Sequence, residues 1–110
     1  MLEHEKLDVY TIALQVAALA YEIADKLPKG HAALAEQLRR AATSVPANIA
    51  EGCGRRHGKD RERFMLIERG SATETAALVD LCLLRVPDLT QAKQVKVHIV
   101  RVVQMLTKMS

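Results

Sequence analysis

The segment QLRRAATSVPANIAEGCGRR, residues 37–56, decides how this chain is expected to fold. Apolar side chains recur along it at helical spacing, at Leu38, Ala42, Val45, Ile49 and Cys53. A polar stripe follows another side of the same helix, at Gln37, Arg40, Ser44, Asn48, Glu51 and Arg55. The segment therefore predicts an amphipathic helix. Its polar stripe faces solvent, a neighbouring helix of the same protomer, or a neighbouring protomer.

A proline lies in the middle of this predicted helix. Pro46 removes one backbone hydrogen bond and crowds the preceding turn, at a cost of about 3 kcal/mol. We expect the helix to continue through Pro46 with a kink that serves packing. Gly52 and Gly54 follow near the helix end, where each indicates either fraying or a close approach of another backbone.

The composition predicts one folded domain over residues 1–110 with an aliphatic core. Apolar residues make up 49% of the chain and charged residues 26%, whereas aromatic residues make up only 3%. The two cysteines show no disulfide pattern, and the amino-terminal residues show no signal-peptide pattern. We therefore expect a soluble cytoplasmic protein without a membrane-spanning segment.

Hydrophobic periodicity predicts four helices. The first covers about residues 5–27 and stops at Pro28 and Gly30, the second starts near Ala32, the third covers about 60–86 from an N-cap at Asp60, and the fourth covers about 90–108. An alternating β-branched run at 95–99 also suits a strand, but such a strand has no partner elsewhere, so we retain the helix. Short connections between long helices predict an all-α, antiparallel up-down-up-down four-helix bundle.

Two helices carry features that matter for packing. The first helix is apolar on more than one side, which predicts contact with further copies of the chain. The third helix is expected to bury Phe64, Ile67, Leu78, Leu81, Cys82 and Val86. Its polar residues Glu68, Ser71 and Glu74 are expected to form a ridge beside Thr75.

The chain offers no complete constellation for catalysis or metal binding. None of the glutamates has a histidine three residues later, so the carboxylate–histidine pairs of a di-metal bundle are absent from the sequence. Cys53 and His57 have the spacing of two metal ligands, but a zinc site needs more ligands than one such pair. No nucleophile with a base and no phosphate-binding glycine loop is found. We therefore expect a protein that is not an enzyme and has no cofactor and no metal.

Basic residues concentrate in the middle of the chain. The net charge is only +3, yet the candidate nucleic-acid contacts cluster, at Arg39, Arg40, Arg55, Arg56, Lys59, Arg61 and Arg63. Acidic residues interrupt the cluster, so a solvated turn with local ion pairs is the alternative interpretation. The scarcity of aromatic residues predicts that any nucleic acid is bound through its backbone and not by base stacking.

The segment 37–56, together with the later ERGSATE at 68–74, resembles the signature of the four-helix-bundle proteins encoded in intervening sequences of bacterial 23S ribosomal RNA. That family also includes the accessory variability determinant of diversity-generating retroelements. The resemblance implies a homopentameric barrel of four-helix bundles. In the retroelement branch it also implies binding of nucleic acid and of a reverse transcriptase. Residues that match the family pattern, and that we expect to serve assembly or packing, are Ser44, Pro46, Asn48, Glu51, Gly52, Gly70, Ser71 and Glu74.

The sequence thus predicts a non-enzymatic oligomeric bundle, with a pentamer favoured, that binds RNA or DNA through a basic surface. An adaptor role for a reverse transcriptase is part of this hypothesis. The alternative is a structural or protein-interaction bundle that binds no nucleic acid. Charge reversal at Arg55, Arg56 and Arg63 would distinguish the two, because only the first predicts lost binding in an intact oligomer.

Overall fold

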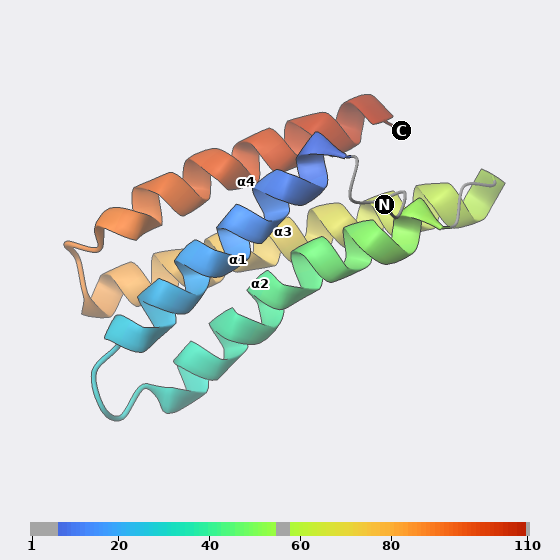
Figure 1. Ribbon diagram of the computed structural model, residues 1–110. Coiled ribbons are helices and arrows are strands. Elements are labelled where there is room, and N and C mark those ends of the chain that lie inside the picture. The colour runs from blue at the N-terminus through green and yellow to red at the C-terminus, as the bar shows by residue number, and fades with distance from the viewer. Residues whose placement is uncertain (1–6, 55–57, 110) are drawn as a thin grey trace.

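The computed structural model describes residues 7–54 and 58–109, and within them the chain forms four helices and no strand. The helices are α1 (Asp8–Lys26), α2 (Ala32–Cys53), α3 (Gly58–Arg85) and α4 (Thr90–Met109). Consecutive helices run in opposite directions, and the chain closes a four-membered ring in which α4 lies beside α1 (Figure 1). The all-α bundle predicted from the sequence is confirmed, including the helix at residues 95–99.

Local sequence signals set the helix ends. Leu27 leaves α1 in an extended conformation (φ −68°, ψ 140°), which is the conformation that a following proline imposes. Gly30 then adopts a φ of +96°, where a side chain would be strained, and the chain turns into α2. Asp60 lies inside the first turn of α3, which begins at Gly58, so the prediction of Asp60 as its N-cap was wrong.

The middle of α2 holds Pro46, which is buried inside a helix that continues to Cys53. The apolar stripe predicted on this helix is confirmed: Leu38, Ala42, Val45 and Ile49 are buried, and Cys53 is half-buried. Aliphatic side chains of α1 and α4 complete the core, among them Val16, Ile23, Val95 and Leu106. The kink at Pro46 stays a prediction.

The buried face of α3 agrees only in part with the predicted one. Its buried residues are Met65, Glu68, Ala72, Thr75, Leu78, Val79 and Cys82, so the predicted burial of Leu78 and Cys82 is confirmed. Ile67 and Leu81, predicted to be buried, are 38% and 47% exposed. The sequence of α3 is apolar on two sides, and the side with Glu68 and Thr75 packs inward although it contains more polar groups.

Two helices extend beyond the other two at one end of the bundle. At 1.5 Å per residue, the 28 residues of α3 span about 42 Å, whereas the 19 residues of α1 span about 28 Å. Figure 1 shows that the end of α2 and the start of α3 project past the start of α1 and the end of α4. Side chains at the start of α3 are therefore reached by solvent from several sides.

Candidate nucleic-acid interface and the α2–α3 seam

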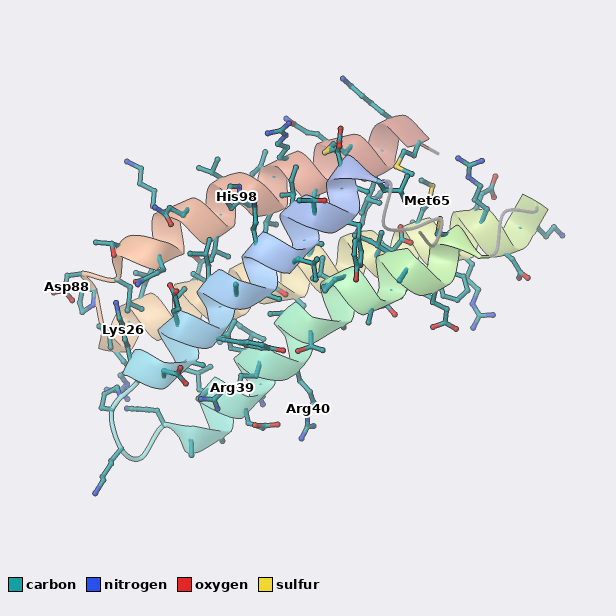
Figure 2. The ribbon with its side chains drawn as sticks, in the orientation of Figure 1. Lys26, Arg39, Arg40, Met65, Asp88 and His98 are labelled. Carbon is teal, nitrogen blue, oxygen red and sulfur yellow. The ribbon has the colours of Figure 1, made fainter. Side chains whose placement is uncertain are left out.

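The candidate cations that the structure describes fall into two groups. Lys59, Arg61 and Arg63 are exposed at the start of α3, on the projecting end. Arg39 and Arg40 lie on α2, fourteen and thirteen residues before its end at Cys53, which corresponds to about 20 Å along the helix. Figure 2 shows both α2 arginines far from the end where Met65 lies. The predicted cluster is therefore not one patch.

Both α2 arginines are close to acidic side chains. The Nη2 atom of Arg39 donates to Oδ1 of Asp25 on α1 at 2.9 Å. The Nε atom of Arg40 lies 3.8 Å from Oε1 of Glu36, one turn earlier on the same helix. Exposed ion pairs add at most about 1 kcal/mol of stability, but they reduce the positive potential that a phosphate would meet.

The cations at the start of α3 are better placed to contact a phosphate backbone than the two arginines of α2. Lys59 and Arg63 are one turn apart and therefore share one face of the projecting end. The Nη2 atom of Arg61 donates to the backbone oxygen of Met109 at 2.6 Å, which holds its guanidinium near the end of α4. The candidates Arg55 and Arg56, and His57 as well, lie outside the described residues.

Of the predicted packing residues, Asn48 and Ser71 meet directly. The Nδ2 atom of Asn48 on α2 donates to Oγ of Ser71 on α3 at 3.0 Å, and both residues are half-buried. Ser71 is held further because its backbone oxygen accepts the hydroxyl of Thr75 at 2.9 Å. This part of the polar stripe of α2 therefore faces a neighbouring helix of the same protomer.

Ser44, Glu51, Gly70 and Glu74, which were also predicted to serve packing, differ from Asn48 and Ser71 in their surroundings. The hydroxyl of Ser44 donates within α2, to the backbone oxygen of Ala41 at 2.6 Å. Glu51, Gly70 and Glu74 are exposed. Ser44 and Glu74 line a groove between α2 and α3, together with Gln37, Arg40, Ala41 and Leu78. These residues do not form one buried network in the protomer.

Gly52 has a specific role in packing α2 against α3. A Cβ atom at this position would stand 2.3 Å from Oε1 of Glu68 and 3.1 Å from Cβ of Phe64. Real side chains do not approach that closely, so Gly52 is required by the close approach of α3. The sequence predicted either fraying or a close backbone approach at this glycine, and the structure shows a close approach of the Glu68 and Phe64 side chains.

Glu68 was predicted from the sequence to belong to a polar ridge with Ser71 and Glu74, but the burial of its side chain was not predicted. Its side chain belongs to the inner face of α3 and is 4% exposed. Burial raises the pKa of Glu68 from 4.5 to about 7, because removal from water disfavours the charged carboxylate. The signal in the sequence was the inner spacing of α3, in which Glu68 stands three residues after Met65 and four before Ala72.

Metal and membrane functions receive no support from the described residues. No group of three or more His, Cys, Asp or Glu side chains in residues 7–54 and 58–109 is arranged to hold a metal ion. Within the same residues, no helix combines the length and the apolar character needed to cross a bilayer. The structure is a helical bundle in which Asn48 and Ser71 form a hydrogen bond between α2 and α3. Exposed cations lie on the projecting end, at Lys59, Arg61 and Arg63.

Comparison with known protein families agrees with a helical bundle. The profile of the 23S rRNA-intervening sequence proteins matches residues 5–108. The chain therefore belongs to the 23S rRNA-intervening sequence protein family, as its central segment indicated. A search of curated proteins gave no match.

Proposed function

We propose that this protein is a non-enzymatic, oligomeric helical bundle that binds RNA or DNA through the projecting end of α3. The observation that carries the proposal is the exposure of Lys59, Arg61 and Arg63 on that end. Arg55 and Arg56 precede them in the sequence and add to the basic character of the segment. Because phosphate contacts need little beyond arranged positive charge, such an end suits backbone binding without sequence reading.

Assembly is supported by a second exposed surface. The outer stripe of α3 consists of Leu66, Gly70, Thr73, Ala77, Leu81 and Leu84, which recur at helical spacing and are all exposed. Leu66 and Leu84 are 62% and 77% exposed. A continuous stripe of leucines and small residues on one helix is a surface that a second helix covers.

A ring needs two different surfaces on each protomer, and α1 supplies the second. Leu14, Ala18 and Tyr21 are exposed along one face of α1, as the apolar excess of this helix predicted. α1 and α3 lie diagonally across the bundle. We propose that the outer stripe of α3 packs against this α1 face of the next copy, because such head-to-tail contacts close into rings such as the pentamer.

Sedimentation velocity tests the assembly. Leu84→Glu and Leu66→Glu place a charge in the outer stripe and should convert the oligomer into monomers at micromolar concentration. Val97→Glu is the matched control, because Val97 is 61% exposed on α4 and outside both surfaces. A wild-type chain that sediments as a monomer would contradict the assembly.

Binding to a labelled RNA and to duplex DNA over a salt series tests the nucleic-acid part. Lys59→Glu with Arg63→Glu should weaken binding of either nucleic acid and flatten its salt dependence, by roughly 0.9 in logarithmic slope per lost contact with duplex phosphate. Lys26→Glu with Lys29→Glu makes the same charge change at the opposite end of the bundle and should have little effect. Absence of salt-dependent binding at low ionic strength would remove this part of the proposal.

The alternative function is a structural or protein-interaction bundle, favoured by the acidic Asp60 and Glu62 that alternate with the cations of α3. An intact oligomer that binds neither RNA nor DNA would support it. The adaptor role for a reverse transcriptase is a further part of the proposal, tested by co-purification of the two proteins. Its failure would leave the nucleic-acid result unchanged.

A further inference from the structure

The projecting end of the bundle contains a cavity with a volume of about 180 Å³. All four helix ends contribute to its wall. The apolar part of the lining consists of Leu7, Ile49, Phe64, Met65, Leu106 and Met109. An apolar cavity of about 150 Å³ is enough to hold benzene, so this one has room for a compact ligand of roughly eight non-hydrogen atoms.

One carboxyl group lies in this apolar wall. Glu68 lines the cavity and is 4% exposed, and Gly52 opposite it provides the space that its Oε1 atom occupies. No charged partner and no hydrogen bond from the described residues contributes to the pKa of this carboxyl, which burial alone raises. Among the described residues, Arg61 is the cation of the lining, and its guanidinium donates to the Met109 carbonyl. Because a buried carboxylate is costly unless it is paired, the cavity favours a ligand that brings a positive charge to Glu68.

The helix ends around the cavity also favour positive charge. Gly52 and Cys53 belong to the last turn of α2, and Leu106 and Met109 belong to the last turn of α4. Carbonyl groups at helix C-termini carry partial negative charge and attract cations. Arg61 demonstrates this attraction, because its guanidinium donates to the backbone oxygen of Met109 at 2.6 Å.

We propose that this cavity binds a small protonated primary amine with an apolar body, whose ammonium group pairs with the carboxylate of Glu68. The apolar body contacts the aliphatic and aromatic lining, and the ammonium group lies toward Glu68 and the end of α2. Neither the outer stripe of α3 nor Lys59 and Arg63 contributes to the lining. Arg61 belongs both to this lining and to the cations of the projecting end, so the variants that test the proposal change Glu68 or Glu74 and leave Lys59, Arg61 and Arg63 in place.

The other titratable groups of the lining are Cys53 on α2 and Arg61 on α3, whereas the lining residues from α1 and α4 are apolar. Arg61 is occupied by the Met109 carbonyl. Glu68 is therefore the group expected to change protonation when the amine binds. With a pKa of about 7, its carboxyl is about half protonated at pH 7, and ammonium binding should release about half a proton per site.

Isothermal titration calorimetry of the full chain at pH 7 tests this inference, with benzylamine as the probe and benzyl alcohol as its neutral counterpart. We expect saturable 1:1 binding of benzylamine per protomer, at least tenfold tighter than that of benzyl alcohol. The binding heat should change between phosphate and Tris buffers, because the released proton is taken up by the buffer. This comparison uses only the wild-type protein, so it does not depend on how a variant folds.

Variants then locate the contact. Glu68→Gln should lower benzylamine affinity at least tenfold and abolish the buffer dependence, while binding of the alcohol is retained. Glu74→Gln removes an exposed carboxyl from the same helix and should leave benzylamine affinity unchanged. Equal binding of amine and alcohol, no saturable binding of the amine, or full affinity in Glu68→Gln would each overturn the proposal.

Discussion

Asn48 on α2 donates through Nδ2 to Oγ of Ser71 on α3 at 3.0 Å, and this bond joins two helices across 23 positions of the sequence. Both partners lie within residues 5–108, which the family profile matches. The bond joins α2 and α3 within one protomer, so it helps to set how these two helices align. Hydrogen bonds of this kind contribute about 1 kcal/mol to stability.

A double-mutant cycle measures this contribution. Asn48→Ala should lower the free energy of unfolding by about 1–2 kcal/mol, because it removes the bond and leaves the Ser71 hydroxyl without its donor. Ser71→Ala in the Asn48→Ala background should then cost less than it does in the wild type. Urea unfolding at constant protein concentration gives the coupling energy, and strictly additive effects would show that the bond contributes nothing.

Gly52→Ala should destabilise the protein by about 1–3 kcal/mol, although alanine is the better helix former. The added methyl group would stand 2.3 Å from Oε1 of Glu68 and 3.1 Å from Cβ of Phe64, so the buried Glu68 carboxyl has to shift and the Phe64 side chain has to give way. Glu68→Ala in the same chain should recover part of the loss.

Gly54→Ala is the matched control for this substitution. Among the described residues, its methyl group would meet the backbone oxygen of Glu51, at an ordinary 3.5 Å. The backbone at Gly54 has a φ of −80°, which alanine adopts freely. Thermal unfolding of the two variants should differ clearly, and equal melting temperatures would contradict the close-approach argument.

The sequence predicted most of the fold because its signals are local. Apolar periodicity identified four helices, and Pro28 with Gly30 identified the first turn. The inner face of α3 was predicted correctly at Leu78 and Cys82 but wrongly at Ile67 and Leu81, because these two residues are more apolar than Glu68 and Thr75, which are nevertheless buried. Periodicity cannot choose between two apolar sides of one helix when the second side is left exposed in the protomer.

The candidate nucleic-acid interface was predictable only in part, because contacts between helices are not visible in a local sequence pattern. A list of basic residues close in sequence does not show which of them meet acids from other helices. Asp25 on α1 lies 14 positions before Arg39, and only the packing of α1 against α2 brings the two together. The cavity beside Glu68 depends on four helix ends at once, which no local pattern describes.

Cys82 should resist alkylation in the folded protein. Its side chain is fully buried in the core, and burial raises the pKa of its thiol, so little reactive thiolate forms. Iodoacetamide labelling at pH 8, followed by mass spectrometry of peptides, should modify Cys53 faster than Cys82, since Cys53 is half-buried. The two cysteines should react at similar rates in denaturant. Equal rates in the folded protein would contradict the burial of Cys82.

Stability should fall as the pH rises, owing to Glu68. The pKa of this carboxyl is about 7 in the folded protein and 4.5 as its ordinary value, so the folded state keeps a proton that the unfolded state loses. The free energy of unfolding should therefore decrease between about pH 4.5 and 7, by up to about 3 kcal/mol from this group. Below pH 4.5 the carboxyl is protonated in both states and contributes no pH dependence.

Glu68→Gln should remove this decline, because its amide stays neutral at every pH in the range. The variant should be more stable than the wild type at pH 8 and comparable to it at pH 4.5, as measured by urea unfolding at one protein concentration. Glu74→Gln removes an exposed carboxyl and should retain the wild-type pH profile. If Glu68→Gln loses stability between pH 4.5 and 7 as steeply as the wild type does, Glu68 is not the group whose buried carboxyl sets the pH dependence.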